Sequence, residues 1–448
     1  MGRFSRGRLL RHPAQYVVVA FVSASLAGTV LLLLPWMTQG DGSTSPLTAL
    51  FTATSAVCVT GLVVVDTGGH WSPLGEGVIL VLIQAGGLGI MTLSSLIVVG
   101  LARRLGLRQR LIAAASTGSL ELGQVRSVLS GVVRVTVVME LATALILFLR
   151  IWITHGEPLG RAVWLAVFHA VSAFNNAGFG LFSDSVIGYQ NDPLVLGVIA
   201  IAVIVGGLGF PVWVQIAAHP RSARQWDLHA KLTVATTIVL LVGGGLAITW
   251  LEWTNPDTLG GLNSFDSVVN GFFHSVMPRT AGFNSIDVGA MREPTQLVTE
   301  TLMFIGGGSG STAGGIKVTT FALLGFVIWA ELRGDPDVVV FHRRVPAVAQ
   351  RQALTVALLA VGAVIGSTIV LSLSTSAPQS ELLFEAVSAL GTVGLSTGVT
   401  PILSSLSQLV IVGLMLLGRV GPPTLFAALV LREHGRLYRH PEERPIIG

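Results

Sequence analysis

The stretch SAVCVTGL, Ser55–Leu62, decides the fold because related stretches recur three more times along the chain at similar spacing. We call these four stretches the strips: SAVCVTGL (Ser55–Leu62), SAFNNAGF (Ser172–Phe179), SVMPRTAGF (Ser275–Phe283) and SALGTVGL (Ser388–Leu395). Each strip begins with serine and ends with a glycine followed by leucine or phenylalanine; the glycines are Gly61, Gly178, Gly282 and Gly394. Such recurrence is typical of a chain built from internal repeats, which settle architecture better than any single motif.

Every strip has the same surroundings. A long apolar segment comes first, at 14–36, 130–153, 230–252 and 350–373. A shorter apolar segment leads into the strip, at 46–57, 161–174, 262–277 and 380–390, and a second long segment follows, at 75–101, 193–217, 295–331 and 403–431. A membrane-spanning helix needs about 20 apolar residues, whereas a segment of about 10–14 is more typical of a re-entrant helix.

The expected fold class is therefore an all-α membrane protein. It consists of four tandem repeats of span, pore helix and span, with eight transmembrane helices and four re-entrant pore helices around one central pore. The predicted repeat boundaries are 1–102, 103–218, 219–333 and 334–448.

The composition supports a membrane protein. Of 448 residues, 51% are hydrophobic and only 11% are charged, whereas soluble domains carry about 25% charged residues. A soluble domain of any size is excluded because no long polar stretch exists to build one. The single cysteine, Cys58, excludes an internal disulfide framework and a cysteine-based zinc site.

The distribution of charge predicts the topology. Most of the 27 lysines and arginines lie in five patches, at 3–11, 103–126, 221–231, 333–351 and 432–444. Cytoplasmic loops carry an excess of basic residues, so these patches are assigned to the cytoplasm. We expect a multi-pass protein of the cell inner (plasma) membrane with both termini cytoplasmic, and no nucleic-acid partner.

The strips favour ion conduction. A non-helical backbone at membrane depth must be buried in protein or line water. Four strips on one axis can use their carbonyl oxygens to replace the hydration shell of a cation, and glycine permits the backbone angles that this requires. The short helix before each strip turns its negative C-terminal end to the axis, which favours a cation. No carboxylate lies within the strips, which suits a monovalent ion.

These arguments define a candidate ion-binding filter, with potassium at the filter as the only metal expected. Its predicted residues are Val57, Cys58, Val59, Thr60, Gly61, Asn175, Asn176, Ala177, Gly178, Thr280, Ala281, Gly282, Gly391, Thr392, Val393 and Gly394. Arg279, within the third strip, is expected to brace the filter from behind through carbonyl groups.

Four span–pore–span repeats, each with one key glycine, resemble the Trk/Ktr/HKT superfamily of cation transporters over nearly the whole chain. Eight spans without an extra N-terminal pair are most similar to the Ktr potassium-uptake membrane subunit. The resemblance implies potassium uptake, a homodimer with one pore per subunit, and a cytosolic nucleotide-binding regulatory ring of the KtrA kind. In plant relatives, serine at the first filter glycine goes with sodium preference, so the four glycines here point to potassium.

A second unusual stretch is IGGGSGSTAGGIK, Ile305–Lys317, which we call the glycine loop. It lies within the predicted span 295–331, which as one helix would be about 55 Å long, against a hydrocarbon core of about 30 Å. We expect the helix to break here. In the family, the loop at this position gates the pore, which implies a gate formed by Gly306, Gly307, Gly308, Ser309, Gly310, Ser311, Thr312, Ala313, Gly314, Gly315, Lys317 and Arg419.

The charges near this loop carry the gate hypothesis further. Lys317 is an intramembrane charge, which is costly and indicates function. Arg419 lies in the glycine cluster of the last span and is expected to face the cavity below the filter. Two other clusters, Gly86–Gly89 and Gly206–Gly209, are interpreted as close helix packing. Glu140, in the middle of a span, is expected to be neutral or paired with Arg134.

Three alternatives remain open to test. The first is a sodium or poorly selective monovalent cation transporter of the same fold, and sodium is also a candidate activator. The second is a nucleotide-dependent membrane enzyme or pump built on the glycine loop, but Ile316 stands where a P-loop needs lysine. The third is an inverted-repeat transporter, which the basic patches oppose because all repeats start on the cytoplasmic side. The favoured interpretation is a non-enzyme without a bound cofactor.

Overall fold

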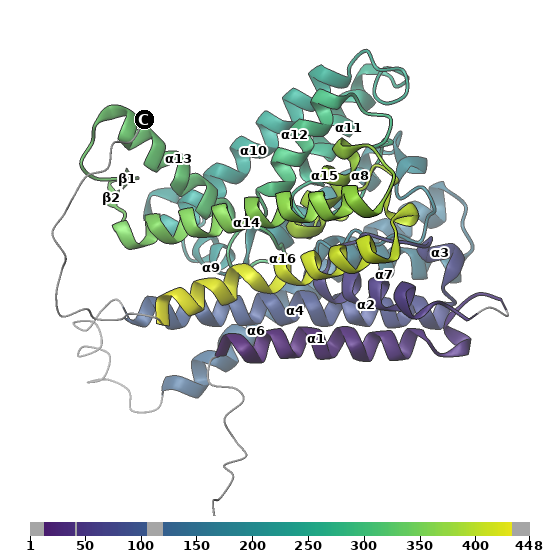
Figure 1. Ribbon diagram of the computed structural model, residues 1–448, viewed down its shortest axis with the longest axis horizontal. Helices are drawn as coiled ribbons and strands as arrows, with labels where there is room; N and C mark the ends of the chain where they lie inside the picture. The colour runs from purple at the N-terminus through teal and green to yellow at the C-terminus, as the bar shows by residue number, and fades with distance from the viewer. Residues whose placement is uncertain (1–12, 41–42, 105–119, 432–448) are drawn as a thin grey trace, which may run out of the picture.

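The computed structural model describes residues 13–40, 43–104 and 120–431, and this part of the chain is predominantly helical (Figure 1). The predicted helical fold class is confirmed at this level. Three predicted basic patches lie wholly or largely outside the described residues, namely 3–11, 432–444 and most of 103–126. Small additional elements are η1 (Pro35–Met37), α3 (Thr67–His70), η2 (Ile187–Tyr189), η3 (Ala223–Gln225), η4 (Thr400–Ile402) and a hairpin of β1 (Val339–Val340) and β2 (Arg343–Arg344).

One long helix precedes each short one. The long helices are α1 (Pro13–Leu32), α6 (Leu120–Thr154), α10 (Leu228–Glu252) and α14 (Ala347–Ser374). The short helices are α2 (Pro46–Cys58), α7 (Leu159–Phe174), α11 (Ser264–Val276) and α15 (Gln379–Gly391). Each short helix packs on the long helix before it, as α1 with α2 and α6 with α7.

The short helices have clear sequence causes for their boundaries. Ser45 caps α2 by accepting a 3.0 Å hydrogen bond from the Thr48 amide, and a proline fills the first turn where no amide partner is needed. Asn263 caps α11 in the same way through the Asp266 amide at 2.9 Å. At the other end, α2 and α15 stop where Val59 and Thr392 adopt left-handed backbone conformations. Each short helix ends within its strip.

The helices that follow the strips are of two kinds. Two are continuous: α4 (Pro73–Arg104) and α16 (Ser405–Leu431). The third is broken into α12 (Glu293–Phe304) and α13 (Val318–Arg333), and the glycine loop joins them, as its glycine content and the excess length predict. Every residue of Ile305–Ile316 except Ser309 is buried.

The second such helix corrects an expectation. We expected one span over 193–217, but the chain forms α8 (Pro193–Leu208) and α9 (Phe210–Ala218), bent by 94°. Gly209 makes the corner with φ 93°, where a β-carbon would lie 2.8 Å from the Ser309 carbonyl oxygen of the glycine loop. The cluster Gly206–Gly209 thus serves both close packing and a helix break.

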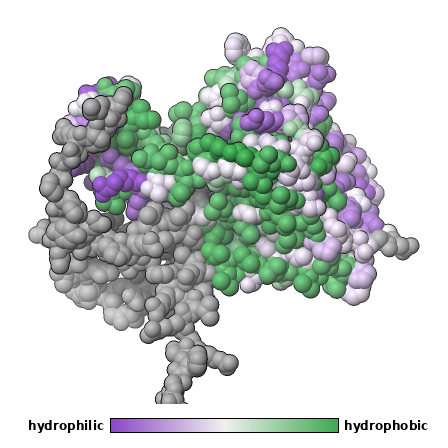
Figure 2. Space-filling model, in the orientation of Figure 1, coloured by the Kyte–Doolittle hydropathy of each residue, from purple (hydrophilic) through white to green (hydrophobic). Residues whose placement is uncertain are grey.

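The described helices include several that are apolar and long enough to cross a membrane. They are Pro73–Thr92, Leu129–Thr154, Leu228–Glu252 and Ala347–Ser374, with the bent pair of α8 and α9 as a possible fifth. Shorter apolar helices cover Val17–Leu32, Pro46–Cys58, Leu159–Phe174 and Ser405–Gly421. Figure 2 shows hydrophobic residues gathered across the middle of the visible face, over α14 and its surroundings. These features are those of a multi-pass membrane protein.

Candidate functional site

The four strips meet in a closed ring. Each strip glycine lies so near the next strip that an added β-carbon would come closer than 3.0 Å to a carbonyl oxygen there. The pairs are Gly61 with Ala177, Gly178 with Ala281, Gly282 with Val393, and Gly394 with Thr60. Because the last pair returns to the first strip, the four segments surround one axis.

The strips share one backbone conformation. The strip glycines have positive φ, at 92°, 69°, 72° and 94° in chain order. The residue two positions before each glycine is also left-handed, and these residues are Val59, Asn176, Thr280 and Thr392. A non-glycine residue in this region costs on the order of 1–3 kcal/mol and persists only where its surroundings hold it there. Four equivalent strained residues around one ring make it the candidate functional site.

The ring presents free oxygen atoms. No described residue donates a hydrogen bond to the carbonyl oxygens of Thr60, Ala177, Ala281 or Val393. These four residues are fully buried, and a buried carbonyl normally has a partner. The described part of the chain contains no group of three or more His, Cys, Asp or Glu side chains that could hold a metal ion. Buried carbonyl oxygens without a hydrogen-bond donor are a ligand set that can take the place of a cation's hydration water.

Two of the serines that begin the strips hold the ring in place. No role was assigned to these serines from the sequence. The Ser55 hydroxyl donates to the Leu62 carbonyl at 2.8 Å and accepts from the Gly61 amide at 3.1 Å. In the fourth strip, the Ser388 hydroxyl accepts from the Gly394 amide at 3.1 Å. These bonds fix the backbone at both glycines.

The second strip is held by a polar cluster behind it. The Asn175 side-chain amide donates to Gln84 Oε1 at 2.9 Å and to Glu140 Oε1 at 3.0 Å. Glu140 was expected to be neutral or paired with Arg134; it accepts a hydrogen bond from Asn175, and no ion pair joins it to Arg134, which is also a described residue. An intramembrane carboxylate is visible in the sequence, but its partner on another helix is not.

The glycine loop is hydrogen-bonded to the bent helix pair α8 and α9. The Gly308 amide donates to the Gly207 carbonyl at 2.8 Å, and the Phe210 amide donates to the Gly310 carbonyl at 3.1 Å. The loop also reaches the second strip, because the Thr312 hydroxyl lies 3.2 Å from the Asn176 side-chain amide. The loop therefore lies directly against the ring.

Arg419 joins this loop to α4. Its guanidinium donates to the Thr312 carbonyl and, at 3.2 Å, to the Gly86 carbonyl on α4. The side chain is 1% exposed, so a full charge is buried next to the loop. Lys317 Nζ donates to the Ala313 carbonyl at 2.6 Å, inside the same loop. Both predicted charges thus contact loop carbonyls.

Arg279 contacts a carbonyl group, as expected for a residue that braces the filter, but not one of a strip. Its guanidinium lies 3.4 Å from the Gly306 carbonyl and 3.4 Å from the Thr237 hydroxyl. The carbonyl that it contacts therefore belongs to the glycine loop and not to a strip. Because Arg279 itself belongs to the third strip, it links the ring to the start of the loop.

The comparisons with known proteins agree on one family. Residues 6–438 match the family model of the TrkH cation transport proteins. The chain is 39% identical over 439 residues to the Ktr system potassium uptake protein B of Bacillus subtilis, covering 97% of each chain. It is 36% identical over 442 residues to the potassium/sodium uptake protein NtpJ of Enterococcus hirae, again covering 97% of each.

The fold agrees with this similarity. The crystal structure of the potassium transporter TrkH from Vibrio parahaemolyticus superimposes with a TM-score of 0.70 at 19% sequence identity, covering 97% of this chain and 87% of that one. These relatives are named as uptake or transport proteins. The chain belongs to the TrkH family of cation transport proteins.

Proposed function

We propose that this protein takes up potassium ions across the plasma membrane, down their electrochemical gradient, through one pore formed by four span–pore helix–span repeats with eight spans. The ring of four unpartnered carbonyl oxygens at Thr60, Ala177, Ala281 and Val393 is the observation that carries the proposal. The relative named as a potassium uptake protein, which matches almost the full chain, supports the choice of ion.

In this proposal the strips form the selectivity filter. Carbonyl oxygens can replace the water around a potassium ion, and the aligned ends of α2, α7, α11 and α15 add negative potential. The ring glycines are required because a side chain at any of them would push against the neighbouring strip. Ser55, Ser388 and the Glu140–Asn175–Gln84 cluster keep the oxygens at a fixed distance from the axis.

The glycine loop and Arg419 form the proposed gate below the filter. A fixed positive charge in a water-poor cavity repels cations strongly, because charges interact more strongly at low dielectric. Opening requires two hydrogen bonds of the loop to break, the one from Arg419 to the Thr312 carbonyl and the one from the Gly308 amide to the Gly207 carbonyl. Lys317, the last residue of the loop, bonds to the Ala313 carbonyl within the same loop, so its charge moves with the loop.

Regulation is proposed to come from outside this chain. A ligand shifts a gate only through different contacts with its two states. We place a cytosolic nucleotide-binding ring on the basic segment 333–351, in which Arg333 ends α13 and Arg343 and Arg344 form β2. The C-terminal tail from Arg432, the second segment proposed for this contact, lies outside the described residues. A homodimer with one pore per subunit completes the proposed assembly.

Rubidium uptake into proteoliposomes tests the transport function. The purified protein is reconstituted with potassium inside, and labelled rubidium is added outside with sodium varied on both sides. We expect unlabelled potassium to compete with rubidium for uptake and sodium not to compete. Absence of uptake by folded, reconstituted protein, with and without a co-expressed cytosolic partner, would overturn the proposal.

A second candidate function is transport of sodium or of several monovalent cations. The relative named as a potassium/sodium uptake protein favours it. In the same assay, labelled sodium uptake of similar size to rubidium uptake supports this alternative. Stimulation of rubidium uptake by sodium without sodium entry identifies sodium as an activator instead.

A further inference from the structure

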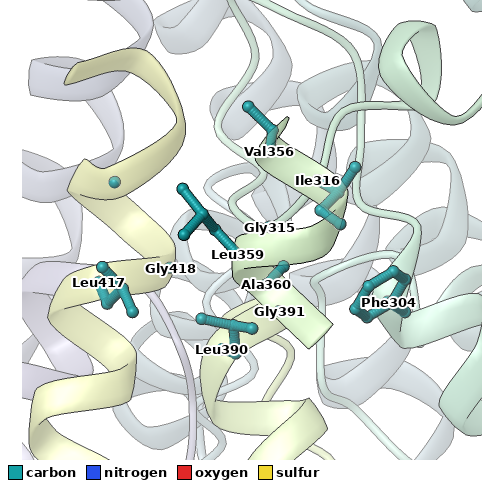
Figure 3. Close-up of a pocket in the computed structure, with 11 residues that line it drawn as sticks. Phe304, Gly315, Ile316, Val356, Leu359, Ala360, Leu390, Gly391, Leu417 and Gly418 are labelled. Carbon is teal, nitrogen blue, oxygen red and sulfur yellow. The ribbon is translucent and has the colours of Figure 1, made fainter. Parts of the chain in front are cut away.

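A cavity of about 60 Å³ lies beside the C-terminal end of the glycine loop. Side chains from α12, α14, α15 and α16 converge on it, and Figure 3 shows Leu359, Leu390 and Leu417 among them. Every residue that lines it is glycine, alanine, valine, leucine, isoleucine or phenylalanine. A cavity without polar partners does not hold water, and such cavities accept apolar molecules.

The floor of this cavity belongs to the proposed gate and filter. Gly315 and Ile316 of the glycine loop line it together with Gly391, where the fourth pore helix ends, and Gly418. The Gly315 amide donates to the Gly418 carbonyl at 3.3 Å, and a β-carbon on Gly315 would lie 3.2 Å from the Gly391 Cα. A molecule in the cavity therefore touches the loop next to the bond that holds it to α16.

The mouth of the cavity faces the surroundings of the protein. Leu359 on α14 and Leu417 on α16 are 52% and 45% exposed, whereas Ile316 at the floor is 5% exposed. Apart from Arg351 near the N-terminal end of α14, the exposed large side chains along this helix are apolar: Val348, Leu354, Leu358, Leu359, Val361, Ile365, Ile369 and Leu373. In a bilayer, acyl chains cover such a surface, so the mouth of the cavity is continuous with the lipid-facing surface of the protein.

We propose that this cavity binds the hydrocarbon chain of a membrane lipid, which enters between α14 and α16 and stabilises the position of the glycine loop. The effect on flux rests on the proposed gate function of the loop, whereas the binding does not. A chain that fits the cavity only in the present loop position shifts the gate toward that position. Membrane composition thereby becomes an input to transport.

Photolabelling tests the binding directly. The protein is reconstituted in vesicles of phosphatidylcholine that carries a diazirine at the end of one acyl chain, and labelled residues are mapped by mass spectrometry. We expect label on Ile316 and Phe304 in the parent. Ala360→Phe and the smaller Ala360→Leu fill the cavity and should abolish that label, while label on the outer face of α14, such as Ile365, persists.

Val361→Phe is the matched control, because this neighbouring residue on α14 is exposed and does not line the cavity. It should leave the label on Ile316 unchanged. Label on α14 with none on Ile316 in the parent would overturn the proposal, and so would equal loss in the control. Cys58 is the only cysteine and is buried, so Leu359→Cys reports a second copy at the mouth. A disulfide between two copies with no acyl label also refutes lipid binding.

Rubidium uptake of the same variants measures the link to the gate. The cavity-filling variants should change uptake at least twofold relative to Val361→Phe and should lose the parent's response to acyl-chain length. Labelling of a protein that transports no potassium would mean that the proposed function is wrong while the lipid site stands. Unchanged uptake in variants that have lost the label would refute the stabilisation of the loop.

Discussion

Gly61 and Ala177 belong to different strips and lie so close that a β-carbon on Gly61 would come within 3.0 Å of the Ala177 carbonyl oxygen. The same relationship repeats around the ring and ends with Gly394 against Thr60. A side chain at one glycine therefore acts on the oxygen of the neighbouring strip, which is one of the four proposed to bind the ion. Ion preference should be sensitive to these glycines before overall folding is.

Gly61→Ser should raise sodium uptake relative to rubidium uptake severalfold. The added side chain must displace the Ala177 carbonyl, and φ 92° is unfavourable for any side chain. Gly40→Ser is the control, because Gly40 has φ 86° but nothing within 4 Å of an added β-carbon. An unchanged ratio of the two ions in folded Gly61→Ser would contradict the filter assignment.

Glu140 should matter through Asn175. Glu140→Ala removes the acceptor of the 3.0 Å hydrogen bond from Asn175 and should cost about 1–3 kcal/mol of stability. It should also change the ratio of sodium to rubidium uptake, because Asn175 belongs to the second strip. Glu140→Gln keeps an oxygen acceptor and should restore most of that ratio. Glu300→Ala, at a carboxyl group on α12, is the control for loss of a glutamate side chain, and an equal effect there would argue against a specific role.

Asp192, which lies outside the spanning helices, should make an acid-sensitive contribution to the stability of the fold. Burial raises the pKa of this carboxyl, but hydrogen bonds from Arg150 at 2.7 Å and His155 at 3.0 Å outweigh it, so the pKa lies below its ordinary value. A depressed pKa stabilises the fold above the unfolded pKa of about 3.9, and this contribution is lost as pH falls through the folded value.

Thermal unfolding in detergent against pH measures this effect. Asp192→Asn should lower the unfolding temperature at neutral pH and should flatten its decline at acid pH. Asp257→Asn, at an exposed carboxyl, should reproduce the parent curve. If Asp192→Asn gives the same curve as the parent, the hydrogen bonds of Asp192 add nothing to stability.

Local sequence was enough to find the strips and the break at the glycine loop. Glycine recurrence identifies Gly61 and its equivalents because the backbone there needs positive φ, which few residues allow. The break over 305–317 follows from its glycines and from the excess length of the predicted span. These features depend on neighbouring residues and therefore appear in the sequence.

Features that depend on distant segments did not appear. Gly209 looks like a packing glycine, and its helix breaks because the glycine loop, about a hundred residues later, occupies the corner. Arg279 lies in a strip, yet its partner is Gly306 on that loop. The partner of Glu140 is likewise on another helix. Choosing among such partners requires the relative placement of helices, which periodicity does not supply.

The last prediction concerns the contact between Arg419 and Thr312. If the glycine loop and this arginine are the barrier, removing either should open the path. Deleting Gly308–Ala313 removes the segment that carries the Thr312 carbonyl and the Gly308 amide bond to Gly207. Flux should rise and depend less on a cytosolic partner, while the ratio of sodium to rubidium uptake stays near the parent value because the strips are intact.

Arg419→Ala should act in the same direction, since it removes the repulsive charge and frees the loop. Arg419→Lys keeps the charge but cannot reach both the Thr312 and Gly86 carbonyls with a planar group, so its flux should lie between parent and alanine variant. Arg292→Ala, at an arginine that bonds to Leu251 and Thr254 away from the loop, is the control. The measurement is initial rubidium uptake per folded protein, with and without a co-expressed partner. A folded deletion variant that conducts less than the parent would show that the loop is a structural support, because removing a barrier cannot lower the flux.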